Sequence, residues 1–121
     1  MAYIDLTTQN FNETLDNNEI VIIDFWAEWC GPCRQFAPIF EKIAEENPDI
    51  TFAKVNTEEQ QAIANEYNVH SIPTLMVSRD GIILLNQAGM LPEETFNKLI
   101  EHVKGLDMDQ IRAEMEAEEE E

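Results

Sequence analysis

The chain has 121 residues, of which 44% are hydrophobic, and it carries 25 acidic against 7 basic side chains for a formal net charge of −18. Its length and hydrophobic content are those of a single globular domain with one modest core. The charge argues against nucleic acid or an anionic membrane as a partner, because both would repel an acidic protein. No run approaches the 18 apolar residues of a membrane span, and the first residues lack the pattern of a secretory signal, so a cytoplasmic protein is expected.

The first third of the chain predicts a strand, a helix and a second strand. Tyr3 to Leu6 is a short strand, and Thr7 or Thr8 can cap a helix that runs to about Leu15. After a turn at residues 16–18, the apolar and largely β-branched run from Ile20 to Trp26 is typical of a fully buried strand.

Apolar residues at helical spacing follow from Arg34 to Glu46. Pro38 lies inside this helix and should kink it, because proline removes one backbone hydrogen bond. Asn47-Pro48-Asp49 ends the helix, residues 50–55 form the next strand, and Glu58 to Tyr67 form a short helix.

The last elements predicted before the tail are a hairpin and a helix. Residues 74–78 and 82–87 read as strands on either side of Arg79-Asp80-Gly81, a turn of the Asp-Gly kind. Pro92 opens a final helix with one apolar face. The order βαβαβαββα indicates an α/β fold, with a central mixed sheet of five strands flanked on both faces by four helices.

The composition changes at the end of the chain. Residues 105–121 hold two aspartates and six glutamates against one arginine, a net charge of −7. We therefore expect a domain at residues 1–104 and an acidic C-terminal tail at residues 105–121, partly helical or disordered, with a docking or regulatory role as the alternative.

The only two cysteines, Cys30 and Cys33, lie where the buried strand passes into a helix. A disulfide between them closes a very small ring and would add little to stability in the chain-entropy model. Free N–H groups and the positive dipole end at the start of a helix favour a thiolate, and can lower a thiol pKa from about 8.5 towards 7. We expect Cys30 to attack a foreign disulfide and Cys33, one turn further in, to resolve the mixed disulfide.

Asp24 interrupts the apolar strand before the cysteines. A buried carboxyl should have a raised pKa, which would make it a good proton acceptor for the resolving thiol. The alternative is an acid on an edge strand that faces solvent.

The string from Asp24 to Cys33, with Ser71-Ile72-Pro73-Thr74-Leu75 forty residues later, closely resembles the thioredoxin family from about residue 3 to about residue 104. The resemblance implies the thioredoxin fold and a monomeric protein-disulfide reductase that works by dithiol–disulfide exchange. It implies no bound cofactor, because NADPH acts indirectly through thioredoxin reductase. The implied partners are that reductase and disulfide-containing proteins. The tail departs from the family pattern.

The resemblance also implies individual roles. Asp24 matches the family's proton acceptor, and Lys54 matches a lysine that moderates its charge, although a strand lysine can instead reach out to water. Pro73 is implied to be a cis-proline that faces the cysteine pair, and the backbone of Ile72 to offer hydrogen bonds to an extended substrate.

The remaining predicted substrate contacts surround the cysteines. Trp29 is expected to be an exposed contact surface, with burial in the core as the alternative. Gly31 leaves room for a second molecule to approach, and Pro32 suits the first helical turn. Gly89 and Met90 resemble the family's substrate-facing turn, where Met90 is larger than the usual alanine.

Three other functions are weighed against the reductase. An oxidase or isomerase of the same fold tends to carry histidine at the position of Pro32, and its potential would be higher. A redox-independent protein-binding scaffold would keep its function without both cysteines. A metal site is disfavoured because two cysteines and two distant histidines are poorly spaced ligands.

Overall fold

Five strands form one sheet in the computed structural model, which describes residues 2–120. The strands are β1 (Tyr3–Asp5), β2 (Ile20–Trp26), β3 (Thr51–Asn56), β4 (Thr74–Arg79) and β5 (Ile82–Ala88). Their spatial order is β1-β3-β2-β4-β5. β3 is parallel to β1 and β2, whereas β4 is antiparallel to both of its neighbours, so the predicted mixed sheet is confirmed.

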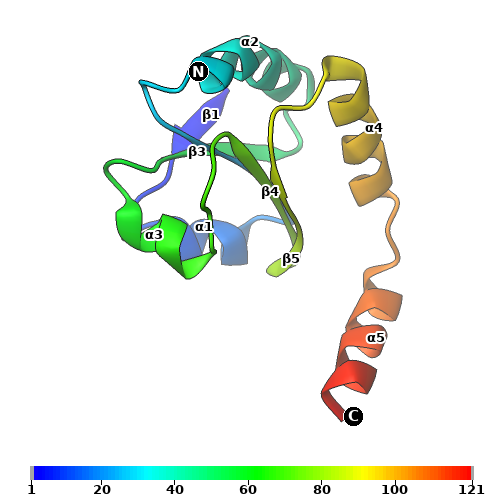
Figure 1. The fold of residues 1–121 in the computed structure, drawn as a ribbon. Helices are drawn as coiled ribbons and strands as arrows, with labels where there is room; N and C mark the ends of the chain where they lie inside the picture. Colours follow the sequence, from blue (N-terminus) through cyan, green and yellow to red (C-terminus); the bar gives the residue numbers. More distant parts are fainter. Residues whose placement is uncertain (1, 121) are drawn as a thin grey trace.

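The helices lie on both faces of this sheet (Figure 1). They are α1 (Phe11–Asn17), α2 (Gly31–Glu46), α3 (Gln61–Glu66), α4 (Glu93–Lys104) and α5 (Met108–Glu120). α2 and α4 cover one face and α1 and α3 the other (Figure 1). Four helices were predicted, and the described part of the chain has a fifth because the acidic tail also folds into a helix.

The two faces of the sheet bury separate apolar clusters. The cluster beneath α2 and α4 is rich in phenylalanine: Phe36, Phe40, Phe52 and Phe96. The cluster beneath α1 and α3 is largely aliphatic and includes Leu6, Leu15, Val21, Ile23 and Ile63. Side chains alternate between the two faces along a strand, so Ile22 and Asp24 of β2 share the face that α2 covers.

Two helices begin later than predicted, and hydrogen bonds explain both cases. α1 starts at Phe11 because the Asn10 side chain accepts the Thr7 N–H at 2.7 Å and closes a turn first. α3 starts later because the Asn56 side chain accepts the N–H groups of Glu58 and Glu59. α2 begins at Gly31 with Cys30 as its N-cap, so the cysteine pair lies at the start of the helix as predicted, and the helix continues through Pro38.

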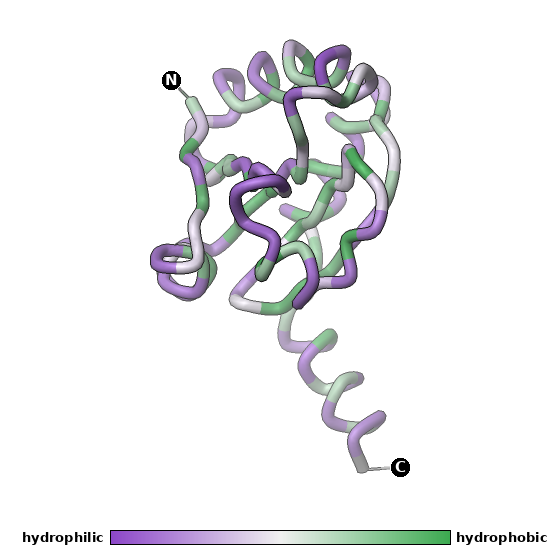
Figure 2. Tube along the Cα trace, turned by 60° about the vertical axis from the view of Figure 1, so that its left-hand side comes forward, coloured by the Kyte–Doolittle hydropathy of each residue, from purple (hydrophilic) through white to green (hydrophobic). Residues whose placement is uncertain are grey.

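The acidic tail extends away from the sheet and its helices (Figure 2). The Asp107 side chain accepts the Gln110 N–H at 3.1 Å, which satisfies a free donor at the start of α5. Met108 is buried, whereas Asp109 and the residues from 112 to 119 are exposed. Residues 108–120 therefore form a helix that is buried at its first residue and exposed from residue 112 to residue 119.

Candidate active site

The site forms where β2, the central strand of the sheet, passes into α2. Cys30 is the N-cap residue of α2, with extended backbone angles (φ −86°, ψ 111°). Gly31 and Pro32 are the first two helical residues, where the missing N–H of proline costs no hydrogen bond. A strand in the core and a 16-residue helix thus hold the two cysteines at a fixed place.

Cys30 and Cys33 form a disulfide, with their Cα atoms 5.2 Å apart. The Cys33 backbone N–H donates a hydrogen bond to Cys30 Sγ at 3.2 Å. The two residues are enclosed to nearly the same degree, with exposed fractions of 4% and 3%. Exposure therefore does not distinguish the two cysteines, but within residues 2–120 an N–H of the first helical turn is bonded to the sulfur of Cys30 and not to that of Cys33.

The loop before β4 approaches this disulfide. Cys30 Sγ lies 3.7 Å from the carbonyl oxygen of Ile72. The peptide bond between Ile72 and Pro73 is cis, as predicted. The Pro73 carbonyl accepts the Gly89 N–H at 2.8 Å, and Gly89 has a φ of +97°, which favours glycine. The sheet thereby brings Ile72, Pro73 and Gly89 together, although they come from two loops.

Two large side chains near the disulfide are open to solvent. Trp29 is 66% exposed, which contradicts the alternative that it is a core residue. Its indole N–H donates to Glu58 Oε1 at 2.6 Å, so the ring is held by the loop after β3. Met90, which follows Gly89, is also exposed. Both residues offer apolar surface that the chain itself does not cover.

Asp24 is buried on the face of β2 that α2 covers, with 1% of its surface exposed. Its Oδ1 atom has no hydrogen-bond partner in the described structure. Burial raises the pKa of Asp24 to about 7, against a partial lowering by the Lys54 ammonium and a further rise from the Glu41 carboxylate. The predicted rise in pKa is confirmed, and the solvent-facing alternative is wrong because β2 is a central strand.

Lys54 lies beside Asp24 in the parallel register of β3 and β2. It is buried, so the alternative of a lysine that reaches out to water is wrong. Its Nζ atom is 3.5 Å from Glu41 Oε2 and 4.4 Å from the centre of the Tyr3 ring. The ammonium therefore has one carboxylate partner at ion-pair distance, Glu41, and acts on Asp24 from further away.

A cavity of about 100 Å³ connects these groups to the disulfide. It is lined by Asp24, Trp26, Cys33, Arg34, Ala37 and Lys54. A space of this volume is large enough for water, and the polar side chains of Asp24 and Lys54 in its lining can bond to it. Cys33 and Asp24 therefore border one space that is large enough for water.

Two residues that contribute to the site were not predicted from the sequence. Glu41 pairs with Lys54 and raises the pKa of Asp24. It lies eight residues after Cys33, so helical spacing places it on the same face of α2, and that signal could have identified it. Glu58 holds the Trp29 indole, but no sequence signal links two residues in separate loops.

Within residues 2–120, no group of three or more histidine, cysteine or acidic side chains is arranged to hold a metal ion. Among the same residues, no helix is both long and apolar enough to cross a bilayer.

Comparisons with known proteins agree with this geometry. A thioredoxin family model matches residues 2–102. The "Putative thioredoxin 2" of Streptomyces coelicolor is 50% identical over 109 residues, which cover 90% of this chain and 81% of that protein. The thioredoxin of Bacillus subtilis is 38% identical over 101 residues and covers 83% of this chain and 96% of its own length.

Solved structures give the same result. A mutant thioredoxin from Halobacterium salinarum superposes with a TM-score of 0.79 at 32% identity, covering 87% of this chain and 92% of that one. The Plasmodium falciparum thioredoxin superposes with a TM-score of 0.76 at 32% identity, covering 83% of this chain and 97% of that one. Sequence, fold and the geometry of the cysteine pair lead to one conclusion: the chain belongs to the thioredoxin family.

Proposed function

We propose that Cys30 and Cys33 are the reacting pair with which this chain reduces disulfides in other proteins. Members of the thioredoxin family are thiol–disulfide oxidoreductases that carry electrons in their own dithiol and not on a bound cofactor. The observation that carries the proposal is the 3.2 Å hydrogen bond from the Cys33 N–H to Cys30 Sγ at the start of α2. A donor in this position stabilises a thiolate on Cys30.

The first step is attack by Cys30. In the reduced protein, its thiolate forms a bond to one sulfur of the substrate, and the substrate S–S bond breaks. The other substrate sulfur leaves as a thiolate and takes a proton from water. The product is a mixed disulfide between Cys30 and the substrate.

The second step is resolution by Cys33. Its thiol passes a proton through the cavity to the carboxylate of Asp24, and the resulting thiolate attacks Cys30 Sγ. The mixed disulfide breaks, and the second substrate sulfur leaves as a thiolate that takes up a proton from water, while Asp24 gives up the proton from Cys33 to solvent. The substrate has gained two electrons and two protons, and the chain is left with the Cys30–Cys33 disulfide. Lys54 keeps the pKa of Asp24 from rising further, so the carboxylate is available near neutral pH.

The substrate is held mainly through its backbone. The Ile72 carbonyl, close to Cys30 Sγ, is positioned to accept a hydrogen bond from an extended segment, with Pro73 beside it. Trp29 and Met90 supply apolar contact surface, and Gly31, Pro32 and Gly89 leave space for the segment's main chain. Backbone recognition accepts many sequences, which predicts broad specificity.

The catalytic unit is residues 1–104, and the acidic tail at residues 105–121 takes no part in exchange. Thioredoxin reductase, a general kind of partner for this family, would return the chain to the dithiol state with electrons from NADPH. That cycle suits a reducing compartment, which supports a cytoplasmic protein. The net charge of −18 gives self-repulsion that supports a monomer.

Insulin reduction coupled to NADPH through thioredoxin reductase tests this function. The wild type should turn over, Cys30→Ser should be inactive, and Cys33→Ser should accumulate a covalent adduct with a substrate. A reduction potential near −270 mV is expected, and a value of about −120 to −180 mV would identify an oxidase or isomerase instead. If the double variant Cys30→Ser/Cys33→Ser keeps the cellular function, the chain acts as a scaffold and the proposal fails.

A further inference from the structure

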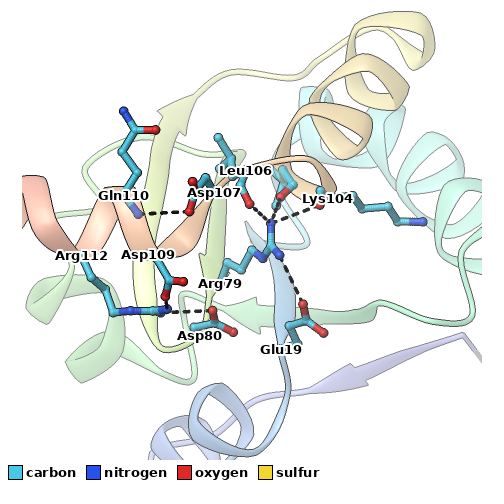
Figure 3. Close-up of polar contacts among 10 residues, drawn as sticks. Glu19, Arg79, Asp80, Lys104, Leu106, Asp107, Asp109, Gln110 and Arg112 are labelled. Atoms are coloured by element: carbon cyan, nitrogen blue, oxygen red, sulfur yellow. Dashed lines mark hydrogen bonds and ion pairs between the residues drawn. The ribbon is translucent and has the colours of Figure 1, made fainter.

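The acidic tail is fastened to the body at the end of β4 (Figure 3). Arg79, the last residue of β4, donates from Nη1 to the carbonyl oxygens of Val103, Lys104 and Leu106, at 2.6, 3.2 and 3.1 Å. Its Nη2 atom lies 3.4 Å from Glu19 Oε1. One guanidinium therefore bonds to the last carbonyls of α4 and to the link into α5.

The start of α5 is held by further contacts (Figure 3). Arg112 pairs with Asp80 of the β4–β5 turn at 3.4 Å and with Asp109 at 2.6 Å. Met108, the first helical residue, is buried. Because the first turn is attached in this way, the direction of the rest of α5 away from the body is set by the fold (Figures 1 and 2).

α5 carries an apolar stripe whose outer end is not covered by any part of the chain that the structure describes. Met108, Ile111 and Met115 follow one another at spacings of three and four, so they share one face of the helix. Met108 is buried, Ile111 is half-buried, and Met115 is 42% exposed. The stripe thus begins in contact with the body and continues into solvent.

Carboxylates surround the exposed end of this stripe. Glu118 and Glu119 lie three and four residues beyond Met115, and Glu114 lies three beyond Ile111, so all three border the apolar side chains. Between Met108 and Glu120 there are six acids and one arginine, a net charge of −5. A second copy of this helix would bring the same charges together, which disfavours self-association at this face.

We propose that α5 is a docking helix for a basic amphipathic helical segment of a partner protein. Apolar side chains of that segment would cover Ile111 and Met115, and its lysines or arginines would pair with Glu114, Glu118 and Glu119. In this arrangement two helices pack through their apolar faces, and the positive charges of the partner helix complement the negative charges of α5.

Docking at α5 leaves the redox site free. Arg79 ends β4 and Thr74, which follows Pro73, begins it, so the tail anchor and the substrate loop lie at opposite ends of a strand roughly 17 Å long. A partner held on α5 would stay close to Cys30 at a raised effective concentration without covering it. The inference stands apart from the exchange chemistry.

The test uses the full chain and a synthetic 18-residue peptide of leucine and lysine with its leucines at helical spacing. We expect binding to shift the methyl resonance of Met115 in NMR spectra. The double variant Ile111→Gln/Met115→Gln should bind at least tenfold more weakly. Ile4→Gln removes an equally exposed apolar residue from the far edge of the sheet and should bind like the wild type. Glu114→Gln/Glu118→Gln/Glu119→Gln should bind more weakly and depend less on salt.

Equal affinity for the wild type and Ile111→Gln/Met115→Gln would overturn the proposal, as would a Met115 resonance that does not move. Sedimentation that shows dimers dependent on Met115 would also overturn it, because the occupant would be a second copy. Insulin reduction by Ile111→Gln/Met115→Gln should equal that of the wild type. Loss of docking is therefore distinguishable from loss of exchange.

Discussion

Asp24 and Cys33 line the same cavity of about 100 Å³, although Asp24 lies on a central strand and Cys33 in the helix that covers it. Burial of the carboxyl has a cost for the fold, because an ionised group in the core lacks water and Asp24 Oδ1 has no hydrogen-bond partner in the described structure. The same burial brings the pKa of Asp24 to about 7, where a carboxyl can both take up and release a proton.

Asp24→Asn should stabilise the oxidised protein, and more so at higher pH. The unfolded chain loses the Asp24 proton near pH 3.8, whereas the folded chain keeps it up to about pH 7. A rise in pH between these two values therefore favours unfolding. From pH 5.5 to pH 8.5, the advantage of the variant should grow by about 2 kcal/mol, most of it below pH 7. Urea unfolding at pH 5.5 and at pH 8.5 measures the difference in the free energy of unfolding between the variant and the wild type.

The control for that experiment is Asp16→Asn, which removes an exposed carboxylate. Its free energy of unfolding should stay within about 0.5 kcal/mol of the wild type at both pH values. A constant difference between Asp24→Asn and the wild type across this range would mean that Asp24 is ionised throughout.

Lys54→Met and Glu41→Gln should move the pKa of Asp24 in opposite directions. Removal of the Lys54 ammonium takes away a charge that favours the carboxylate, so the pKa should rise. Removal of the Glu41 carboxylate takes away a like charge, so the pKa should fall. NMR titration of the Asp24 carboxyl carbon gives both values directly.

The pH dependence of mixed-disulfide resolution should shift with the pKa of Asp24 in these variants. If Asp24 accepts the proton, the inflection near pH 7 in the wild type should move up in Lys54→Met and down in Glu41→Gln, and should vanish in Asp24→Asn. A single-turnover release assay measures these profiles. Profiles that coincide in all four proteins would show that another base serves Cys33.

Trp29→Ala should weaken reduction of protein substrates with little effect on folding. The indole is 66% exposed and bonded to Glu58, so its loss should change the free energy of unfolding by no more than about 0.5 kcal/mol. We expect about a tenfold rise in KM for insulin, with an unchanged rate for a small aromatic disulfide. Equal effects on both substrates would place Trp29 outside the substrate contact surface.

Arg79→Met should destabilise the fold, whereas Arg112→Met should not. The Arg79 side chain bonds to two carbonyls at the end of α4 and to one in the link to α5, and its loss should cost about 2–4 kcal/mol. Arg112 makes exposed ion pairs, which are worth at most about 1 kcal/mol. Urea unfolding compares the two, and hydrogen exchange at the end of α4 should speed up only in Arg79→Met. Similar losses in both variants would mean that the carbonyl contacts of Arg79 contribute no more to stability than the exposed ion pairs of Arg112.

The sequence by itself determined the order of the elements, the placement of the cysteine pair at the start of a helix, and the burial of Asp24. These features rest on local patterns: an apolar strand with one acid in it, helical spacing after it, and residues suited to a helix start. The match of two separated motifs to the thioredoxin family added the cis bond at Pro73, which no local pattern required.

Only the tertiary structure decided the contacts between segments far apart in the chain. Helix starts shifted because side chains such as Asn56 bound nearby N–H groups before a helix could form. Glu41 and Glu58 joined the site through partners 13 and 29 residues away. The tail became a helix with a fixed start because Arg79 and Met108 contact the folded body. A composition of repelling glutamates predicts a solvated tail, but only packing against the rest of the chain determines where that tail is held.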